Sequence, residues 1–202
     1  WSIASGVTGT TDSGTFWDVS LSVGENQADY FIMNTVNASL GPDTPTEFNP
    51  GSYVQLEKNI NVDFIKPVAV EGFASDLSVA YGFEFREEQF TVISGNKESW
   101  EIGPYFKQGF GIGSNGFGGF SPSMAGTWDR SNFALYVDLE ADVSEQLLLG
   151  LAVRYEDFDT FGSTSNSKLS FLYRATDDLS LRGTTSTGFR APTPGQANIS
   201  NI

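Results

Sequence analysis

The chain contains neither cysteine nor histidine among its 202 residues. The lack of cysteine excludes disulfide bonds and thiolate metal sites. The lack of histidine removes the commonest general base and the commonest transition-metal ligand. A serine nucleophile would therefore need a variant triad, and the G-x-S-x-G turn that presents such a serine does not occur. The sequence predicts a protein that is not an enzyme, with no catalytic residue, no metal site and no cofactor.

Long apolar runs are also missing. No stretch of roughly 18 consecutive apolar residues occurs, which excludes a transmembrane helix. Hydrophobic residues make up 39% of the chain, and its mean hydropathy is -0.19. These values leave a transmembrane β-barrel open, because barrel strands carry apolar residues only at alternate positions.

Basic residues are scarce. The chain has 11 lysines and arginines against 25 acidic residues, which gives a formal net charge of -14. This charge argues against nucleic acid as a partner, because binding to phosphates needs a basic surface. An acidic balance is otherwise typical of secreted, surface and high-salt proteins.

The beginning of the chain has no recognisable start signal. It opens at Trp1, its first methionine is Met33, and no signal peptide precedes the patterned region. We expect a segment excised from a longer protein.

Alternation of apolar and polar residues dominates the second half of the chain, and no helical period appears. Strands are expected over 131–141, 147–155, 168–175 and 179–186, joined by short turns. The alternation predicts that one face of the sheet carries Phe133, Leu135, Val137, Leu149, Leu151, Val153, Leu169, Phe171 and Leu181. In the first half, strands are expected over 17–23, 28–39, 53–66 and 77–85.

The connections between these strands alternate in length. Those expected at 24–27, 67–76, 142–145 and 176–178 are short or moderate, whereas those at 40–52, 95–130 and 157–164 are longer. Short turns on one side and long loops on the other are typical of outer-membrane barrels. The segment 95–130 includes the glycine-rich run GFGIGSNGFGGF, which lacks the lysine of a phosphate-binding loop. We expect that segment to hold no regular element beyond a short hairpin, to bury few side chains and to be the most mobile internal segment.

Charged residues recur on the polar faces of the second-half strands. In a large barrel those faces line the lumen, whereas in a soluble sheet they are merely solvated, and alternation does not separate the two. The basic members are expected to find acidic or hydroxyl partners on adjacent strands. The candidate lumen-facing, ligand-binding residues are Arg154, Glu156, Lys168, Arg174 and Arg182.

Three motifs in the second half resemble the barrel domain of TonB-dependent receptors. They are RYEDF at 154–158, ATDDLSLR at 175–182, and the most specific, GFRAP, formed by Gly188, Phe189, Arg190, Ala191 and Pro192. The segments 34–52 and 77–95 are also similar to that family. The resemblance implies a Gram-negative outer-membrane barrel of about 22 strands, plugged by an amino-terminal domain that this chain lacks. It also implies import of a siderophore-iron complex, cobalamin or an oligosaccharide, driven by the energy-coupling protein TonB acting through the plug.

The fold predicted from these features is all-β, an antiparallel up-and-down meander of about eight strands forming an arc of a larger transmembrane barrel. Residues 1–202 would then be part of one receptor barrel domain, with outer-membrane lipid, TonB and a small-molecule nutrient as partners. The alternative is a soluble β-sandwich, either a ligand-binding or an adhesin-like surface module.

Overall fold

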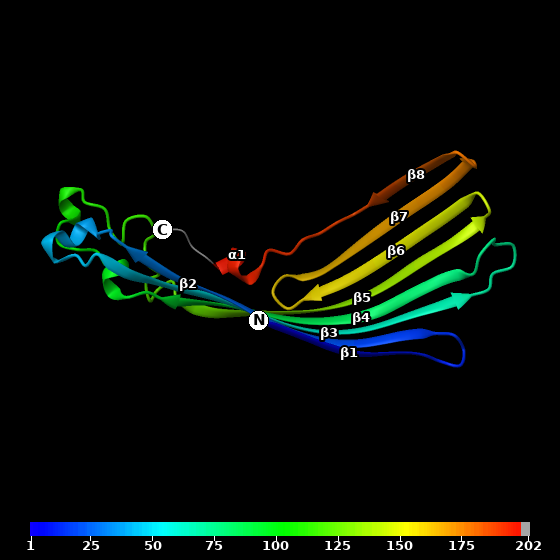
Figure 1. Cartoon of the computed structure of the whole chain (residues 1–202), viewed down its shortest axis with the longest axis horizontal. Helices are drawn as coiled ribbons and strands as arrows, with labels where there is room; N and C mark the ends of the chain where they lie inside the picture. The colour runs from blue at the N-terminus through cyan, green and yellow to red at the C-terminus, as the bar shows by residue number, and fades with distance from the viewer. Residues whose placement is uncertain (199–202) are drawn as a thin grey trace.

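The computed structural model describes residues 1–198 and contains one antiparallel sheet in which each strand pairs with its neighbours in sequence, in the order β1 to β8 (Figure 1). The strands are β1 (Ser2–Thr10), β2 (Phe16–Met33), β3 (Glu47–Val68), β4 (Leu77–Ser94), β5 (Gly126–Ser144), β6 (Leu147–Phe158), β7 (Gly162–Thr176) and β8 (Leu179–Ser186). The predicted all-β meander is confirmed. Within residues 1–198 no second sheet covers the first, as a β-sandwich would require.

Helical structure is limited to short pieces. They are the 3-10 helices η1 (Ala38–Asp43), η2 (Lys97–Ser99) and η3 (Phe106–Gln108), and the helix α1 (Pro194–Asn198). None of the described helices has the length and hydropathy needed to cross a membrane.

The predicted apolar face is confirmed by the strand register. Val137 of β5 lies opposite Val153 of β6, and Leu151 of β6 lies opposite Leu169 of β7. Side chains in the middle of this face remain exposed, at 50% for Leu135 and 52% for Leu169. A single-layered sheet has nothing of its own to cover these groups, so this apolar face is left uncovered by the described chain. The opposite side of the sheet, which carries the charged residues, is here called the polar face.

The start of the sheet differs from the sequence prediction. Residues 24–27 do not form a turn, because β2 runs unbroken from Phe16 to Met33 and Gly24 and Gln27 pair with Glu57 and Val54 of β3. The first strand, β1, was not predicted, because its serines, threonines and glycines do not give a clear apolar alternation.

The connections at one end of the sheet also have other bounds than those predicted from the sequence. The strand β5 begins at Gly126, five residues before the expected start, and the connection at 157–164 is a tight turn over 159–161. The long connections are therefore 34–46 and 95–125, which lie together at the left of Figure 1, here called the loop end. The connections 11–15, 69–76, 145–146 and 177–178 lie at the opposite turn end. Lengths thus still differ between the two ends, although one loop-end connection is short.

The hydrophobic core sits at the loop end, on the polar face. Phe90, Val92 and Phe120 are buried there, and partly buried aromatic residues pack around them, among them Tyr53 and Trp128. Phe120 comes from the connection 95–125, which forms η2 and η3 and no hairpin. The expectation that this segment buries few side chains is confirmed: Ser99, Ser114 and Phe120 are buried, whereas Ile102, Phe106, Phe110 and Ile112 remain exposed.

Candidate functional site

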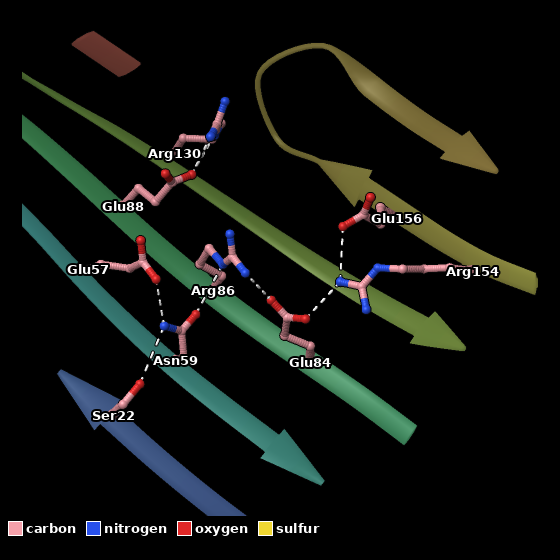
Figure 2. Close-up of polar contacts among 9 residues, drawn as sticks. All are labelled: Ser22, Glu57, Asn59, Glu84, Arg86, Glu88, Arg130, Arg154 and Glu156. Carbon is pink, nitrogen blue, oxygen red and sulfur yellow. Dashed lines mark hydrogen bonds and ion pairs between the residues drawn. The ribbon is translucent and has the colours of Figure 1, made fainter. Parts of the chain in front are cut away.

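A continuous chain of polar contacts crosses the polar face from β2 to β6 (Figure 2). At its centre, the two oxygens of Glu84 each accept from a different arginine, Arg86 and Arg154, at 2.7 Å. Arg154 also pairs with Glu156 at 3.0 Å. Toward β2, Arg86 Nε donates to Asn59 Oδ1 at 3.1 Å. Charges of opposite sign therefore alternate along this chain of contacts, in the order Arg86, Glu84, Arg154 and Glu156.

Asn59 extends this chain to the first strands. Its Nδ2 donates to Glu57 Oε1 at 2.8 Å and to Ser22 Oγ at 3.4 Å (Figure 2). Both hydrogen-bonding ends of the amide are therefore used, which fixes its orientation.

The ion pair between Arg154 and Glu84 bridges over β5. In the register, Glu84 lies opposite Ala134, and Ala134 lies opposite Glu156. Ala134 is fully buried, and its short side chain leaves room for the guanidinium of Arg154 to reach β4. A longer side chain at this position would stand between the two charges.

Tyr136 of β5 also contacts a partner two strands away. It lies opposite Gly82 of β4, and its hydroxyl donates to Asp63 Oδ1 of β3 at 2.6 Å. A Cβ atom at Gly82 would lie 2.4 Å from that Asp63 oxygen and 2.6 Å from the Tyr136 ring. The absence of a side chain at Gly82 is what lets the tyrosine lie across β4.

A buried ion pair lies nearer the loop end. Arg130 and Glu88 are 7% and 5% exposed, and the Arg130 guanidinium donates to Glu88 Oε2. The guanidinium also lies 5.4 Å from the centre of the Phe158 ring and donates to the carbonyl oxygen of Pro192. Neither charged residue could be predicted from the sequence as part of a pair, because a pair joined across β4 and β5 requires the register of the two strands.

The family motif Gly188, Phe189, Arg190, Ala191 and Pro192 follows the last strand and is not part of it, because β8 ends at Ser186. Beyond β8 the chain continues toward the loop end and reaches β4 and β5, where α1 packs against Phe90 through Gly195 (Figure 1). Phe189 packs on Phe161, with ring centres 5.6 Å apart. The motif thus joins the sheet edge to the buried Arg130.

The five candidate ligand-binding residues meet different surroundings. Arg154 and Glu156 belong to the central network, and Arg174 pairs with Asp142 of β5 at 2.7 Å. Lys168 and Arg182 are exposed and form no ion pair with any residue in the described range 1–198. The partners of Arg154 and Arg174 lie on the same strand or two strands away, and not on adjacent strands as expected. A ligand-binding role for these five residues stays a prediction.

Metal-binding groups do not converge. Among residues 1–198, no three carboxylates are grouped as a metal site. Asp159 instead accepts hydrogen bonds from the backbone N–H and hydroxyl of Ser131, and Glu84 and Glu156 are held by arginines. The polar face is therefore built for hydrogen bonding and charge pairing.

Comparison with known proteins gives one match. Residues 1–201 match the family model described as TonB dependent receptor-like, beta-barrel. Neither the curated proteins nor the solved structures gave a match. Since the family model covers nearly the whole chain and the sheet has the expected meander, this chain belongs to the TonB-dependent receptor-like β-barrel family.

Proposed function

We propose that this chain forms one wall of an outer-membrane transporter that imports a scarce nutrient into a Gram-negative bacterium. The apolar face lies against lipid, and the polar face lines the lumen through which the nutrient passes. The loop end faces the outside of the cell, in keeping with the long extracellular loops of such barrels.

The observation that carries this proposal is the contrast between the two faces of one sheet. One face exposes Leu135, Leu151 and Leu169 without cover, and the other carries the paired network around Glu84. A soluble protein rarely leaves so continuous an apolar surface exposed, whereas a membrane barrel requires it.

The wider transport machinery belongs to the same proposal. Residues 1–202 supply part of the barrel, further strands close it, and a plug domain links it to TonB. The nutrient is a siderophore-iron complex, cobalamin or an oligosaccharide. The ligand-binding candidates Arg154, Glu156, Lys168, Arg174 and Arg182 would face it from the lumen.

Deletion of the gene in its native host tests the proposal. The mutant is grown with iron, with cobalamin or with an oligosaccharide as the limiting nutrient, and uptake of the labelled nutrient is measured. We expect a growth and uptake defect under one of these limitations, restored by the intact gene. Normal uptake under all three would contradict the proposal.

A further inference from the structure

The connection 95–125 lies at the loop end of the sheet (Figure 1). Together with Tyr53 it lines a cavity of about 780 Å³ that is open to one side. Its walls include Tyr53 of β3 together with Trp100, Ile102, Ile112, Phe117 and Phe120 of the connection. This volume is in the range of small-molecule sites, which are typically concave and mostly apolar with a few polar groups.

The aromatic walls are fixed by contacts within the protein. The indole N–H of Trp100 donates to the carbonyl oxygen of Gly95 at 3.2 Å, so its polar atom is already satisfied. Phe117 stacks on Tyr30 with ring centres 4.7 Å apart, and Phe120 packs on Tyr53 at 4.6 Å. The rings therefore present apolar surface in defined positions.

The backbone of the cavity is also held in place. The carbonyl oxygen of Ser99, a fully buried residue, accepts from the backbone N–H groups of Ser114 and Gly119 at 2.9 and 2.8 Å. A Cβ atom at Gly119 would lie only 1.9 Å from Ser99 Oγ, so this close approach requires glycine. A site already ordered in the free protein avoids the entropic cost of ordering on binding.

The connection 34–46 holds the cavity-lining connection in place through Asn37. Asn37, fully buried, donates through Nδ2 to the carbonyl oxygens of Glu98 and Glu101 at 2.9 and 3.0 Å. Next to this brace, Ile102 is 64% exposed at the cavity rim, and Ile112 is exposed too. The rim thus offers apolar side chains that the described chain does not cover.

The charges around the cavity restrict what can enter. Glu101 is the charged residue among the described lining residues, and it pairs with Lys97 at 3.2 Å. No arginine or lysine from residues 1–198 lines the cavity, and the chain as a whole carries a formal charge of -14. An anionic ligand would lose hydration here without gaining a cation, which is unfavourable.

We propose that this cavity binds an uncharged oligosaccharide. Sugar rings combine apolar C–H faces, which suit the fixed aromatic walls, with hydroxyl groups, which suit Ser121, the Glu101 carboxylate and the backbone of the glycine-rich run. The inference rests on the proposed transport function, and within it selects neutral sugars over anionic metal chelates.

Binding is measured by isothermal titration calorimetry on the complete receptor that contains this chain, purified in detergent. The probes are maltotriose, cellotriose, xylotriose and N,N′,N″-triacetylchitotriose, all uncharged, with ferric citrate as the anionic chelate. We expect at least one trisaccharide to bind and ferric citrate not to bind. Trp100→Ala and Phe117→Ala should each weaken that binding by about tenfold, because each removes an aromatic wall.

Phe110→Ala is the matched control, since Phe110 is an exposed aromatic residue of the same connection that does not line the cavity. Its affinity should stay within about twofold of the parent. Tight binding of ferric citrate, failure of every trisaccharide to bind, or equal losses in Phe110→Ala and Trp100→Ala would overturn the inference.

Failure of this inference can be told apart from failure of the transport proposal. Uptake of iron or cobalamin by a receptor that binds no trisaccharide would leave the transport proposal standing and reject the sugar site. A trisaccharide that binds, with no uptake defect in the deletion mutant, would do the reverse.

Discussion

Buried polar side chains hold the loop end together at the level of single residues. Arg130 and Glu88 form an ion pair that is buried from solvent, and Asn37 of the connection 34–46 donates to two carbonyl oxygens of the connection 95–125. Burying a charge is costly unless a partner compensates it, so the removal of one partner is more damaging than the pair is stabilising. These positions should therefore respond strongly to substitution.

Replacing Arg130 by methionine should lower the free energy of unfolding by about 3–5 kcal/mol, because Glu88 is left charged and buried without a partner. Arg174→Met is the control, because Arg174 forms a partly exposed pair with Asp142 at 2.7 Å on the polar face and should cost less than about 1 kcal/mol. Urea unfolding of the receptor in detergent measures both. Equal losses in the two variants would show that burial does not set the value of the Arg130 pair.

Replacing Asn37 by alanine should loosen the connection 95–125, because the carbonyl oxygens of Glu98 and Glu101 lose their shared donor. Amide hydrogen exchange is expected to rise in that connection and to stay unchanged in 69–76 at the turn end. The same measurement on the parent tests the prediction that 95–130 is the most mobile internal segment. Unchanged exchange in the variant would mean that Asn37 does not brace the loop.

Small residues in the strands leave room for large side chains to extend over a neighbouring strand. Gly82 and Ala134 lie under Tyr136 and Arg154, respectively, and both long side chains reach a partner two strands away. Sheet stability of this kind depends on interdigitation of large and small residues between neighbouring strands.

Gly82→Ala tests this packing. The added Cβ atom would meet the backbone oxygen of Val62 at 2.8 Å as well as Asp63 and Tyr136, so we expect a loss of about 1–3 kcal/mol in the free energy of unfolding. Gly24→Ala is the matched control, because its nearest neighbour would lie at 3.4 Å, and it should be near neutral. Urea unfolding compares the two, and a neutral Gly82→Ala would refute the packing argument.

The strands of the second half were predictable because their apolar residues alternate without interruption. Leu147 to Tyr155 is such a case, and its register with 131–141 followed from the short turn between them. The alternation fades in 24–27, where Gly24, Asn26 and Gln27 resemble a turn, although their backbone groups pair with β3. Turn-forming composition in an extended strand therefore hid the continuity of β2.

The partners within the site were harder to predict. Local alternation placed Arg154 on the polar face, but its contact with Glu84 depends on the register of three strands and on the small Ala134 between them. The cavity walls arise from a glycine-rich connection whose fold depends on buried hydrogen bonds to Ser99. Neither feature has a periodic signal in the sequence.

At the scale of the whole molecule, the sheet has two environments and two open edges. In the proposed barrel the apolar face lies against lipid, and within residues 1–198 β1 and β8 each pair on one side only. Unpaired backbone groups in a hydrocarbon layer cost several kcal/mol each, so both edges must be paired in the membrane. The apolar face and the two open edges can be tested separately.

Leu169→Arg should destabilise the receptor in lipid by about 2–4 kcal/mol, because it places a charge on the lipid side near the middle of the apolar face. Ser170→Arg puts the same side chain on the polar face of the same strand, and should change stability by less than about 1 kcal/mol. Unfolding in lipid vesicles measures the difference. A larger loss in Ser170→Arg would reverse the assignment of the faces.

The isolated 202-residue chain should neither import a ligand nor remain a soluble monomer. Its two edges and its apolar face should drive association in the absence of detergent. Light scattering measures the association, and an uptake assay in cells that express this piece alone measures transport. A monodisperse, soluble monomer would contradict the membrane-arc assignment and favour the soluble binding module.

The uneven connections have a consequence for the order of folding. Every strand pairs with a neighbour in sequence, so contact order is low and hairpins can form independently. Closing a loop costs more entropy as it lengthens, by about 0.6 kcal/mol for each doubling, and 95–125 is much longer than the turn 145–146. We therefore expect the hairpins of β5 to β8 to close early on entropic grounds. The later pairing of β4 with β5 should then join the first four strands to the last four.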